Sequence, residues 1–361
     1  MRVIFLSLFI FFSSCYLTDE VLEDQDVWEY DLPGNQQMSE ADLLAINTFI
    51  NTGRFEFIRS YMIVRNNKLV FENHFVGSSR NKLRPVDKLT LIFSQLAIGI
   101  ALENGLIDSV RTPIYELLPG YQNAFEEQAS KRAITIENLL LHNAGFSWNE
   151  SVIAPESPNN DINLLKEADD ATAFILSKPL EALPGTRYNF NSGTGFIVSK
   201  IIEEVSGQTL EAFVKETVFA PLHITKYVWM ADPSGTTNGS DGLEIGPIDL
   251  LKIGQLYLNQ GIWKGAEIIP FNWFTESTGM QSLVSSRFGY GYYWNKFNPD
   301  FENNIFNLQD DGHIYMNGDS GDALYVLPQE NLVVVIFAEN LQYQFFNPSL
   351  SLYRATLSTL Q

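Results

Sequence analysis

Apolar residues fall along the chain into runs whose spacing predicts helices and strands. The most apolar run, residues 88–104, repeats hydrophobic side chains at helical spacing on one side and covers the opposite side as well. A helix that is apolar on all sides belongs in the interior of a large domain. Asp87 is placed to cap its N-terminus, and Gly105 is placed to end it. The sequence therefore predicts a buried central helix over residues 88–104.

Shorter apolar runs near the two ends of the chain predict strands. Residues 61–74 form two such runs around Asn66-Asn67, and two asparagines suit the positive φ angles of a tight hairpin turn. Further strands are predicted over 314–315, 323–327 and 332–338. Helices are predicted over 39–50 and after Pro348. Strands at both ends with helices between them indicate one antiparallel sheet, built from the two termini, with a large helical insertion.

The first 15 residues indicate a secretory signal. Arg2 precedes an apolar run from Val3 to Phe12, which is shorter than the roughly 20 residues that a transmembrane helix needs. Cys15 is the only cysteine in the chain and follows two small residues, as in a bacterial lipobox. We predict that Cys15 is lipidated; the alternative is a plain signal in which this cysteine is incidental. The acidic residues that follow predict a solvated tether over 16–38.

Composition restricts the partners. The chain has 361 residues, of which 45% are hydrophobic and 18% charged, as expected for a folded protein with a sizeable core. The formal net charge of −20 argues against nucleic acid or an anionic lipid surface as a partner, because binding phosphates requires clustered Lys and Arg. The lipid on Cys15 would then be the only attachment to a membrane. We expect the protein in the bacterial cell envelope, at the outer membrane or periplasmic face, or periplasmic or secreted if it carries no lipid.

Several motifs follow the central helix in a characteristic order. Residues 134–145 read Ile-Thr-Ile-Glu-Asn-Leu-Leu-Leu-His-Asn-Ala-Gly, residues 184–193 read Pro-Gly-Thr-Arg-Tyr-Asn-Phe-Asn-Ser-Gly, and a Gly-rich segment spans 234–242. Taken together, the series resembles the serine β-lactamase and penicillin-binding protein group, in its class C-type esterase and nylon-oligomer hydrolase branch. The resemblance covers residues from about 40 to about 345.

The resemblance implies an α/β (α+β) fold of the β-lactamase/transpeptidase type. In that fold an antiparallel sheet is flanked by N- and C-terminal helices, and the active site lies in a cleft beside a helical region. We therefore expect one domain over 39–361. Its α/β part would comprise 39–85 and 300–361, and its helical insertion would comprise 86–299.

The family's catalytic positions hold other residues here. The resemblance implies Ser-x-x-Lys on the first turn of the central helix, a nucleophile and the lysine that helps to deprotonate it. These two positions are occupied by Lys88 and Leu91. The family's Tyr-x-Asn or Tyr-x-Ser motif aligns with Phe190-Asn-Ser192, so the tyrosine hydroxyl is lost.

The family's third motif, a Lys-Thr-Gly or His-x-Gly strand, aligns with Met316-Asn-Gly318, which removes the usual cation. Asp319 and Asp322 add negative charge where the carboxylate of an anionic substrate is expected. A lysine titrates near 10.4 and is a poor nucleophile when protonated, so we predict that Lys88 is a surface or cleft lysine paired with Asp87. No catalytic residue of the family is intact, and we interpret the chain as a degenerate member of a hydrolase family.

Three functions stay open at this point. The cleft of an inactive member would bind a small molecule, a peptide or a glycan. An active hydrolase would use rearranged residues, with Ser192 or Ser320 as the nucleophile, on a β-lactam, an ester or an amide. A structural envelope lipoprotein would have its cleft filled by side chains such as Leu91, Phe190 and Met316.

Neither a cofactor nor a metal is predicted. The four histidines, His74, His142, His223 and His313, are widely spaced and show no metal-binding pattern such as His-x-x-x-His. We predict that His142 is a structural histidine in the turn after its helix, and that His313 is an exposed loop residue. The aromatic residues of 288–294 could line a ligand groove, but core packing explains them equally well.

Overall fold

The computed structural model describes residues 28–55, 57–154, 156–286, 288–297, 313–339 and 348–361. The predicted signal with Cys15, and residues 16–27 of the predicted tether, lie outside the described residues. None of the helices in the described ranges has the length and apolar character needed to cross a bilayer.

Nine strands of the described residues form a sheet at the centre of the fold, in the order β1-β3-β2-β14-β13-β12-β11-β10-β9. The strands are β1 (Glu29–Tyr30), β2 (Ile58–Arg65), β3 (Lys68–His74), β9 (Ser282–Leu283), β10 (Phe288–Tyr290), β11 (Asn295–Phe297), β12 (Ile314–Asn317), β13 (Ala323–Leu327) and β14 (Leu332–Ala338). Neighbouring strands pair antiparallel, except that β1 pairs parallel with β3. Because β2 pairs with β14, the sheet joins the two ends of the chain, as predicted.

The hairpin between β2 and β3 is also confirmed. Asn66 and Asn67 have φ angles of 49° and 64°. Asparagine tolerates this left-handed region better than most residues, because its short polar side chain can bond locally. The turn therefore fixes the register in which Arg65 opposes Lys68.

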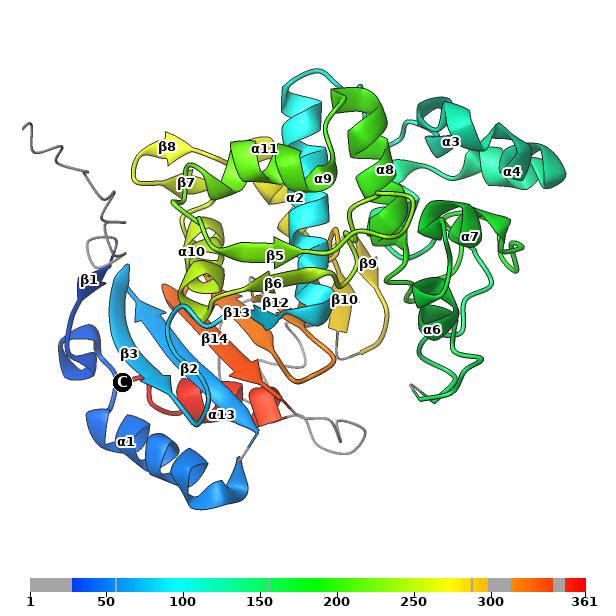
Figure 1. Ribbon diagram of the computed structural model, residues 1–361. Helices are drawn as coiled ribbons and strands as arrows, with labels where there is room; N and C mark the ends of the chain where they lie inside the picture. Colours follow the sequence, from blue (N-terminus) through cyan, green and yellow to red (C-terminus); the bar gives the residue numbers. More distant parts are fainter. Residues whose placement is uncertain (1–27, 56, 155, 287, 298–312, 340–347) are drawn as a thin grey trace, which may run out of the picture.

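Both faces of the sheet are buried, which explains why its strands are continuous apolar runs. In β2, Tyr61 and Ile63 belong to one core, and Met62 and Val64 belong to the other. The first core lies beneath α1 (Glu40–Phe49) and α13 (Pro348–Leu357), and the second lies against α10 (Pro247–Leu258) and the helices beyond it. Figure 1 shows α1 and α13 on one side of the sheet and the larger helical part on the other.

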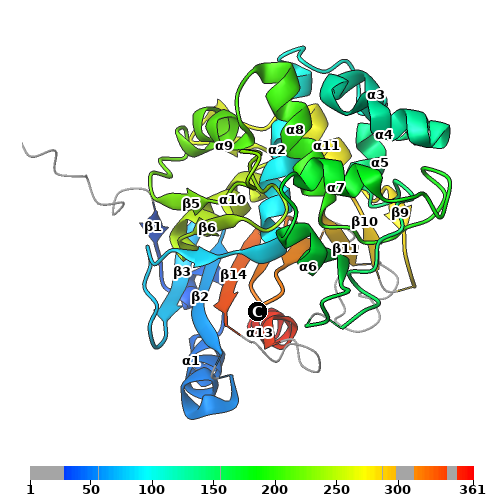
Figure 2. The same ribbon diagram turned by 45° about the vertical axis from the view of Figure 1, so that its right-hand side comes forward.

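The helical part surrounds α2 (Thr90–Glu103), which stands at its centre in both views (Figures 1 and 2). The other helices are α3 (Ile114–Leu117), α4 (Gln122–Glu127), α5 (Ile136–Leu140), α6 (Asp161–Lys166), α7 (Ala171–Ser177), α8 (Thr194–Ser206), α9 (Leu210–Val214) and α11 (Phe271–Thr278). A small sheet joins β4 (Arg84–Pro85), β5 (Tyr227–Trp229) and β6 (Leu243–Ile245), and β7 (Ile262–Trp263) pairs with β8 (Ala266–Glu267). Every residue of α2 from Thr90 to Ala101 is buried, so the predicted buried helix is confirmed.

The start of the central helix differs from the prediction, whereas its end does not. A 3-10 turn over Asp87–Leu89 precedes α2, and Asp87 does not cap the helix with its side chain. Its carboxylate instead accepts a hydrogen bond from the backbone N–H of Ser320, 2.8 Å away. Gly105, with φ of 67°, ends the helix as expected, because glycine enters this conformation without a steric penalty.

Two expected boundaries also differ. The strands β9, β10 and β11 extend the sheet, although the sequence placed their residues in the helical insertion. Residues 28–38, which the sequence placed in the tether, pack on the domain, since Trp28 is buried and β1 pairs with β3. These strands have only two or three residues each, which is too short for an alternating pattern to be visible in the sequence.

Candidate functional site

The start of α2 lies close to the end of β12, and this contact positions the residue that replaces the nucleophile. A Cβ atom on Gly318 would lie 3.1 Å from the Cβ of Asp87, which is closer than ordinary van der Waals contact, so glycine allows the two segments to approach closely. Lys88, the next residue, is only 3% exposed. The predicted pairing with Asp87 and the surface position are wrong, because Lys88 is buried and the Asp87 carboxylate accepts from Ser320.

Three carboxylates surround the ammonium group of Lys88. Its Nζ lies 3.1 Å from Oε1 of Glu150, 3.5 Å from Oδ2 of Asp241 and 3.5 Å from Oδ2 of Asp319. We call these four residues the Lys88 cluster. The side chains of Glu150 and Asp241 are largely buried, whereas that of Asp319 is 69% exposed, so the cluster meets solvent at that carboxylate.

Lys88, Glu150 and Asp241 hold one another ionised, whereas burial and the neighbouring carboxylates raise the pKa of Asp319 above its ordinary value. Burial alone would lower the pKa of Lys88, but Glu150, Asp319 and Asp241 outweigh it and raise that pKa well above its ordinary value. Burial alone would raise the pKa of Glu150 and Asp241, but the ammonium group of Lys88 is the main influence that lowers both below their ordinary values. Lys88 is therefore a permanent cation that cannot act as an amine nucleophile at neutral pH.

Glu150 is fixed by hydrogen bonds from two segments. Ser192 donates to it with the backbone N–H at 2.9 Å and with the hydroxyl at 2.8 Å, and Trp148 donates with its indole N–H at 2.9 Å. Asn189 holds the loop in place by donating to the carbonyl oxygens of Phe146 and Trp148. Asp241 is positioned likewise by Asn238, which donates to Oδ1 at 2.8 Å.

The remaining family positions carry side chains without acid–base chemistry. Leu91 is fully buried, and Met316, 2% exposed, belongs to the same core. The ring of Phe190 lies against the imidazole of His142, with 4.7 Å between the ring centroids. The two serines considered as alternative nucleophiles differ: Ser192 is fully buried against Glu150, whereas Ser320 is partly exposed and contacts Asp87 through its backbone N–H.

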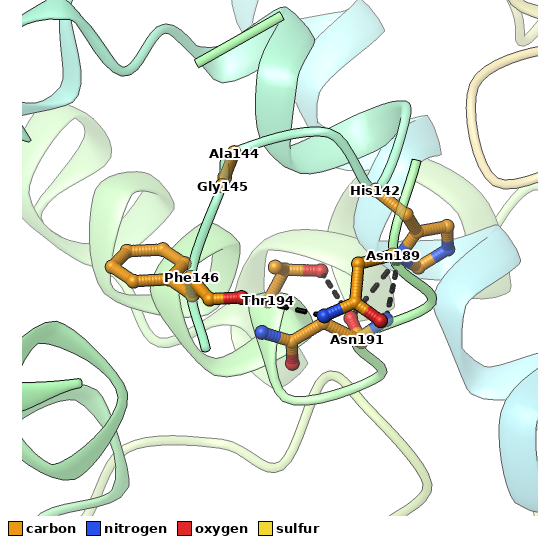
Figure 3. A pocket seen from close by; sticks show the side chains of 7 residues that line it. All are labelled: His142, Ala144, Gly145, Phe146, Asn189, Asn191 and Thr194. Atoms are coloured by element: carbon orange, nitrogen blue, oxygen red, sulfur yellow. Dashed lines mark hydrogen bonds between the residues drawn. The ribbon is translucent and has the colours of Figure 1, made fainter. Parts of the chain in front are cut away.

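His142 lies beside this site, in a compact turn with φ of 51° (Figure 3). Its Nδ1 is 3.1 Å from the backbone oxygen of Asn191, and its ring packs against Phe190, Tyr290 and Tyr293. Burial lowers the pKa of His142 to about 4, so the imidazole is neutral at physiological pH. The neighbouring cavity of about 10 Å³ has room for about one water molecule.

The other histidines are placed away from any shared site. His313 is buried, and its Nδ1 lies 2.9 Å from the hydroxyl of Tyr353, so the prediction of an exposed loop histidine is wrong. His74 contacts Ser60 and Glu72 in the sheet. Over the part of the chain that the structure describes, no group of three or more His, Cys, Asp or Glu side chains is arranged to hold a metal ion.

A larger cavity, of about 420 Å³, lies next to the Lys88 cluster and shares Asp241 with it. We call it the acidic cavity. Three carboxylates, those of Asp87, Asp232 and Asp241, line it together with the ammonium-bearing Lys166. Its apolar lining comes mainly from α6, α8 and the loop after β5: Ile162, Leu165, Phe196, Met230 and Pro233. Its volume is within the range of cavities that bind small molecules, about 300–1,000 Å³.

Glu150 and Asp241 are the site residues that the sequence did not reveal. Neither belongs to a catalytic motif of the resemblance, and each is one of many acidic residues in a chain of net charge −20. A lysine at a buried helix start requires a carboxylate partner, so the position of Lys88 indicates that such partners exist. It could not have told which residues they are.

The sheet with helices on both faces, and the altered site at the start of its central helix, define a protein of the β-lactamase/transpeptidase fold. The chain belongs to the beta-lactamase family: the family model described as Beta-lactamase matches residues 60–355. This confirms both the fold and the resemblance that the sequence motifs suggested.

Individual relatives are more distant. An Escherichia coli (strain K12) protein named "Putative D-alanyl-D-alanine carboxypeptidase" is 28% identical over 120 residues, or 32% of this chain and 26% of that protein. The chain thus matches only about a quarter of the length of this curated relative.

Solved structures match over nearly the whole chain. The "Putative 6-aminohexanoate-dimer hydrolase from Bacillus anthracis" aligns with a TM-score of 0.71 at 18% identity, covering 90% of this chain and 84% of that one. An octameric penicillin-binding protein homologue from Pyrococcus abyssi aligns with a TM-score of 0.67 at 19% identity, covering 88% of this chain and 76% of that one. At these identities the likeness shows the fold alone.

Proposed function

We propose that this beta-lactamase family member no longer performs serine acyl transfer and instead binds a small molecule, a peptide or a glycan beside the former active site. The observation that carries the proposal is the Lys88 cluster. A protonated lysine, paired with three carboxylates at 3.1–3.5 Å, occupies the position of the nucleophile.

Acyl transfer needs a nucleophilic oxygen and a base that removes its proton. At the family positions, Lys88 offers a permanent cation, Leu91 an aliphatic side chain, and Phe190 a ring without a hydroxyl. When such groups are lost together, only the contributions of binding and of oxyanion stabilisation are left. The proposal follows from the combined loss rather than from any one substitution.

A second candidate is a hydrolase that uses rearranged residues, and one contact favours it. The hydroxyl of Ser192 donates to Glu150 at 2.8 Å, in the manner of a nucleophile and its base. Two features weigh against this role. The pKa of Glu150 is lowered, which makes it a weak base, and Ser192 is fully buried.

The acidic cavity supports the binding role over a purely structural one. In a structural lipoprotein, side chains at the former catalytic positions would fill the space, and Leu91 and Met316 are indeed buried. The space of about 420 Å³ beside Asp241 nevertheless stays open.

We also propose that the protein is exported and anchored in the bacterial envelope by a lipid on Cys15. The support is the apolar N-terminal run and the sole cysteine after two small residues. Metabolic labelling with an alkyne-bearing fatty acid tests this proposal. Label on the wild type and not on a Cys15→Ala variant is expected, whereas equal labelling of both would contradict it.

The loss of acyl transfer is tested by intact-protein mass spectrometry. Residues 16–361 are incubated with a penicillin and separately with an activated ester, alongside an active hydrolase of the family. No adduct is expected on this chain when the active hydrolase is fully labelled. A stoichiometric adduct would overturn the proposal, and its absence from Ser192→Ala or Ser320→Ala would then identify the nucleophile.

A further inference from the structure

The acidic cavity has an apolar wall and a one-sided excess of negative charge. Phe196 and Leu165 are buried at its wall, while Met230 is about half exposed. An apolar enclosure of this size suits the hydrocarbon part of a small ligand. The charged groups that line the cavity then determine which charge on the ligand is favoured.

Lysine side chains do not neutralise the acidic groups around this space. Among the lining residues that the structure describes, Lys166 is the one cation, against the carboxylates of Asp87, Asp232 and Asp241. Lys88 also pairs with Asp241, but its single positive charge is divided among Asp241, Glu150 and Asp319. Across the lining and the Lys88 cluster, carboxylates therefore outnumber ammonium groups, and the cavity carries a negative potential.

The three lining carboxylates are not equally available to a ligand. Asp232 accepts hydrogen bonds from the hydroxyl of Ser234 and from the backbone N–H groups of Thr236 and Ala171. Both of its carboxylate oxygens are therefore already engaged within the protein. Asp87 accepts one backbone hydrogen bond, at Oδ2 from Ser320. A carboxylate has about four lone-pair sites, so Asp87 keeps acceptor capacity for a cationic group at the cavity edge.

We infer that the acidic cavity binds a small amphipathic cation: a primary ammonium or guanidinium group directed at Asp87 and Asp241, with an apolar body against Phe196 and Leu165. This inference rests on the proposed binding function and specifies its ligand class. An anionic ligand of the same shape is excluded by repulsion from the same carboxylates. Opposite charges in a partly enclosed site attract more strongly than in water, because the surrounding dielectric is lower.

The test compares three probes of one shape: 3-phenylpropylamine, 3-phenylpropan-1-ol and 3-phenylpropanoate. Each is titrated against the full chain in mild detergent, and binding is followed by ligand-observed NMR. The amine is expected to bind at least about tenfold more tightly than the alcohol, and the carboxylate more weakly than either. An amine that binds no more tightly than the alcohol would overturn the inference.

Two substitutions of lining residues should shift the affinity in opposite directions. Asp87→Asn removes one charge, keeps the acceptor for Ser320, and suits the φ of 47° at this position. It is expected to weaken amine binding by roughly threefold to tenfold, and Lys166→Gln to strengthen it by roughly twofold to threefold. Asp169→Asn is the matched control, because Asp169 follows the lining residue Ala168 but does not line the cavity.

The same experiments separate this inference from the broader proposal. If all three probes bind equally, or if Asp169→Asn has the same effect as Asp87→Asn, the cationic ligand class is overturned while the loss of acyl transfer stands. A covalent adduct with penicillin would overturn the loss of acyl transfer, whatever the three probes do.

Discussion

Two neighbouring regions, the Lys88 cluster and the acidic cavity, share Asp241 and use their carboxylates differently. In the Lys88 cluster a buried ammonium group holds Glu150 and Asp241 ionised, and further hydrogen bonds fix both carboxylates. In the acidic cavity, carboxylates line an open space of about 420 Å³. Charge pairing inside the protein engages the carboxylates of the first region, whereas those of the second face a space large enough for a small molecule.

This difference shows that pairing with a buried cation and exposure to a cavity give neighbouring carboxylates different roles. Glu150 and Asp241 are largely buried carboxylates that need a counter-charge, and Lys88 supplies it from the short turn before α2. Substitutions in each region should show how far the two regions are independent.

Lys88→Met should be the most destabilising of the substitutions considered. It leaves Glu150 and Asp241 buried without their cation, and removing one partner of a buried ion pair costs about 3–5 kcal/mol. Urea unfolding measures the loss in free energy of unfolding. Adding Glu150→Gln to the same chain should restore part of the loss, because it removes one unpaired charge.

The control for this substitution is Arg187→Gln, which removes the cation of the exposed ion pair with Glu181. Its unfolding midpoint should stay at the wild-type value, because exposed pairs are screened by water. A Lys88→Met protein as stable as wild type would show that the Lys88 cluster does not hold the structure.

His142 should make the protein less stable as the pH falls below 6.5. Its pKa is lowered by burial from 6.5 to about 4 in the folded state, so between these values the unfolded chain binds a proton that the folded chain does not. The stabilisation is complete above pH 6.5 and is lost towards pH 4, by at most about 3 kcal/mol. Urea unfolding at several pH values measures this loss.

A His142→Asn variant should show a flatter pH dependence between pH 6.5 and 4.5, and asparagine suits the left-handed backbone there. His223→Asn is the matched control, since His223 is exposed and has a similar φ of 53°. It should keep the wild-type pH profile. Parallel profiles for wild type and His142→Asn would contradict the assignment of the proton to His142.

Ser192→Ala should lower stability without changing reactivity. It removes a hydroxyl hydrogen bond to an ionised carboxylate, which is worth about 1.5–3 kcal/mol. Ser320→Ala should cost less, because the contact with Asp87 uses the backbone N–H, which alanine retains. Chemical denaturation and penicillin labelling measure the two properties, and a wild-type adduct that disappears in Ser192→Ala would restore the hydrolase alternative.

Ala168→Trp should have the smallest effect on stability of the substitutions considered, while it weakens ligand binding in the acidic cavity. The added ring would occupy the acidic cavity from its wall and weaken binding of 3-phenylpropylamine by about tenfold or more. The unfolding midpoint should remain near the wild-type value, because Ala168 contributes nothing to the Lys88 cluster. Ala129→Trp, an exposed position elsewhere, is the control. Unchanged binding by Ala168→Trp would place the probe outside this cavity.

Much of the fold could be predicted from the sequence, because local patterns determine it. The apolar period of α2, the Asn66-Asn67 turn and the terminal strands each carry a signal within a few residues. The short strands β9 to β11 carry none, because two or three residues cannot show a period.

The candidate site was predictable only in part. The sequence motifs locate Lys88, Leu91, Phe190 and Met316, since those positions follow from the order of the family's elements. They do not reveal that Lys88 is buried or that Glu150 and Asp241 reach it, because long-range charge pairing leaves no local pattern. The burial of His313 could not be predicted for the same reason. Two aspartates shortly before it in the sequence suggest an exposed loop, yet it is buried beside Tyr353.

The pairing of β2 with β14 has a consequence for how the chain reaches its native state. Val64 opposes Val333, so the middle of the sheet cannot close until nearly the whole polypeptide has been synthesised. Contacts between residues so distant in sequence slow folding, because a long loop must be closed before they form. A nascent chain that ends before residue 332 leaves one edge of β2 without a partner, and such unpaired edges favour aggregation. A chain truncated before β14 therefore cannot assemble the central sheet, because β2 then lacks its pairing partner.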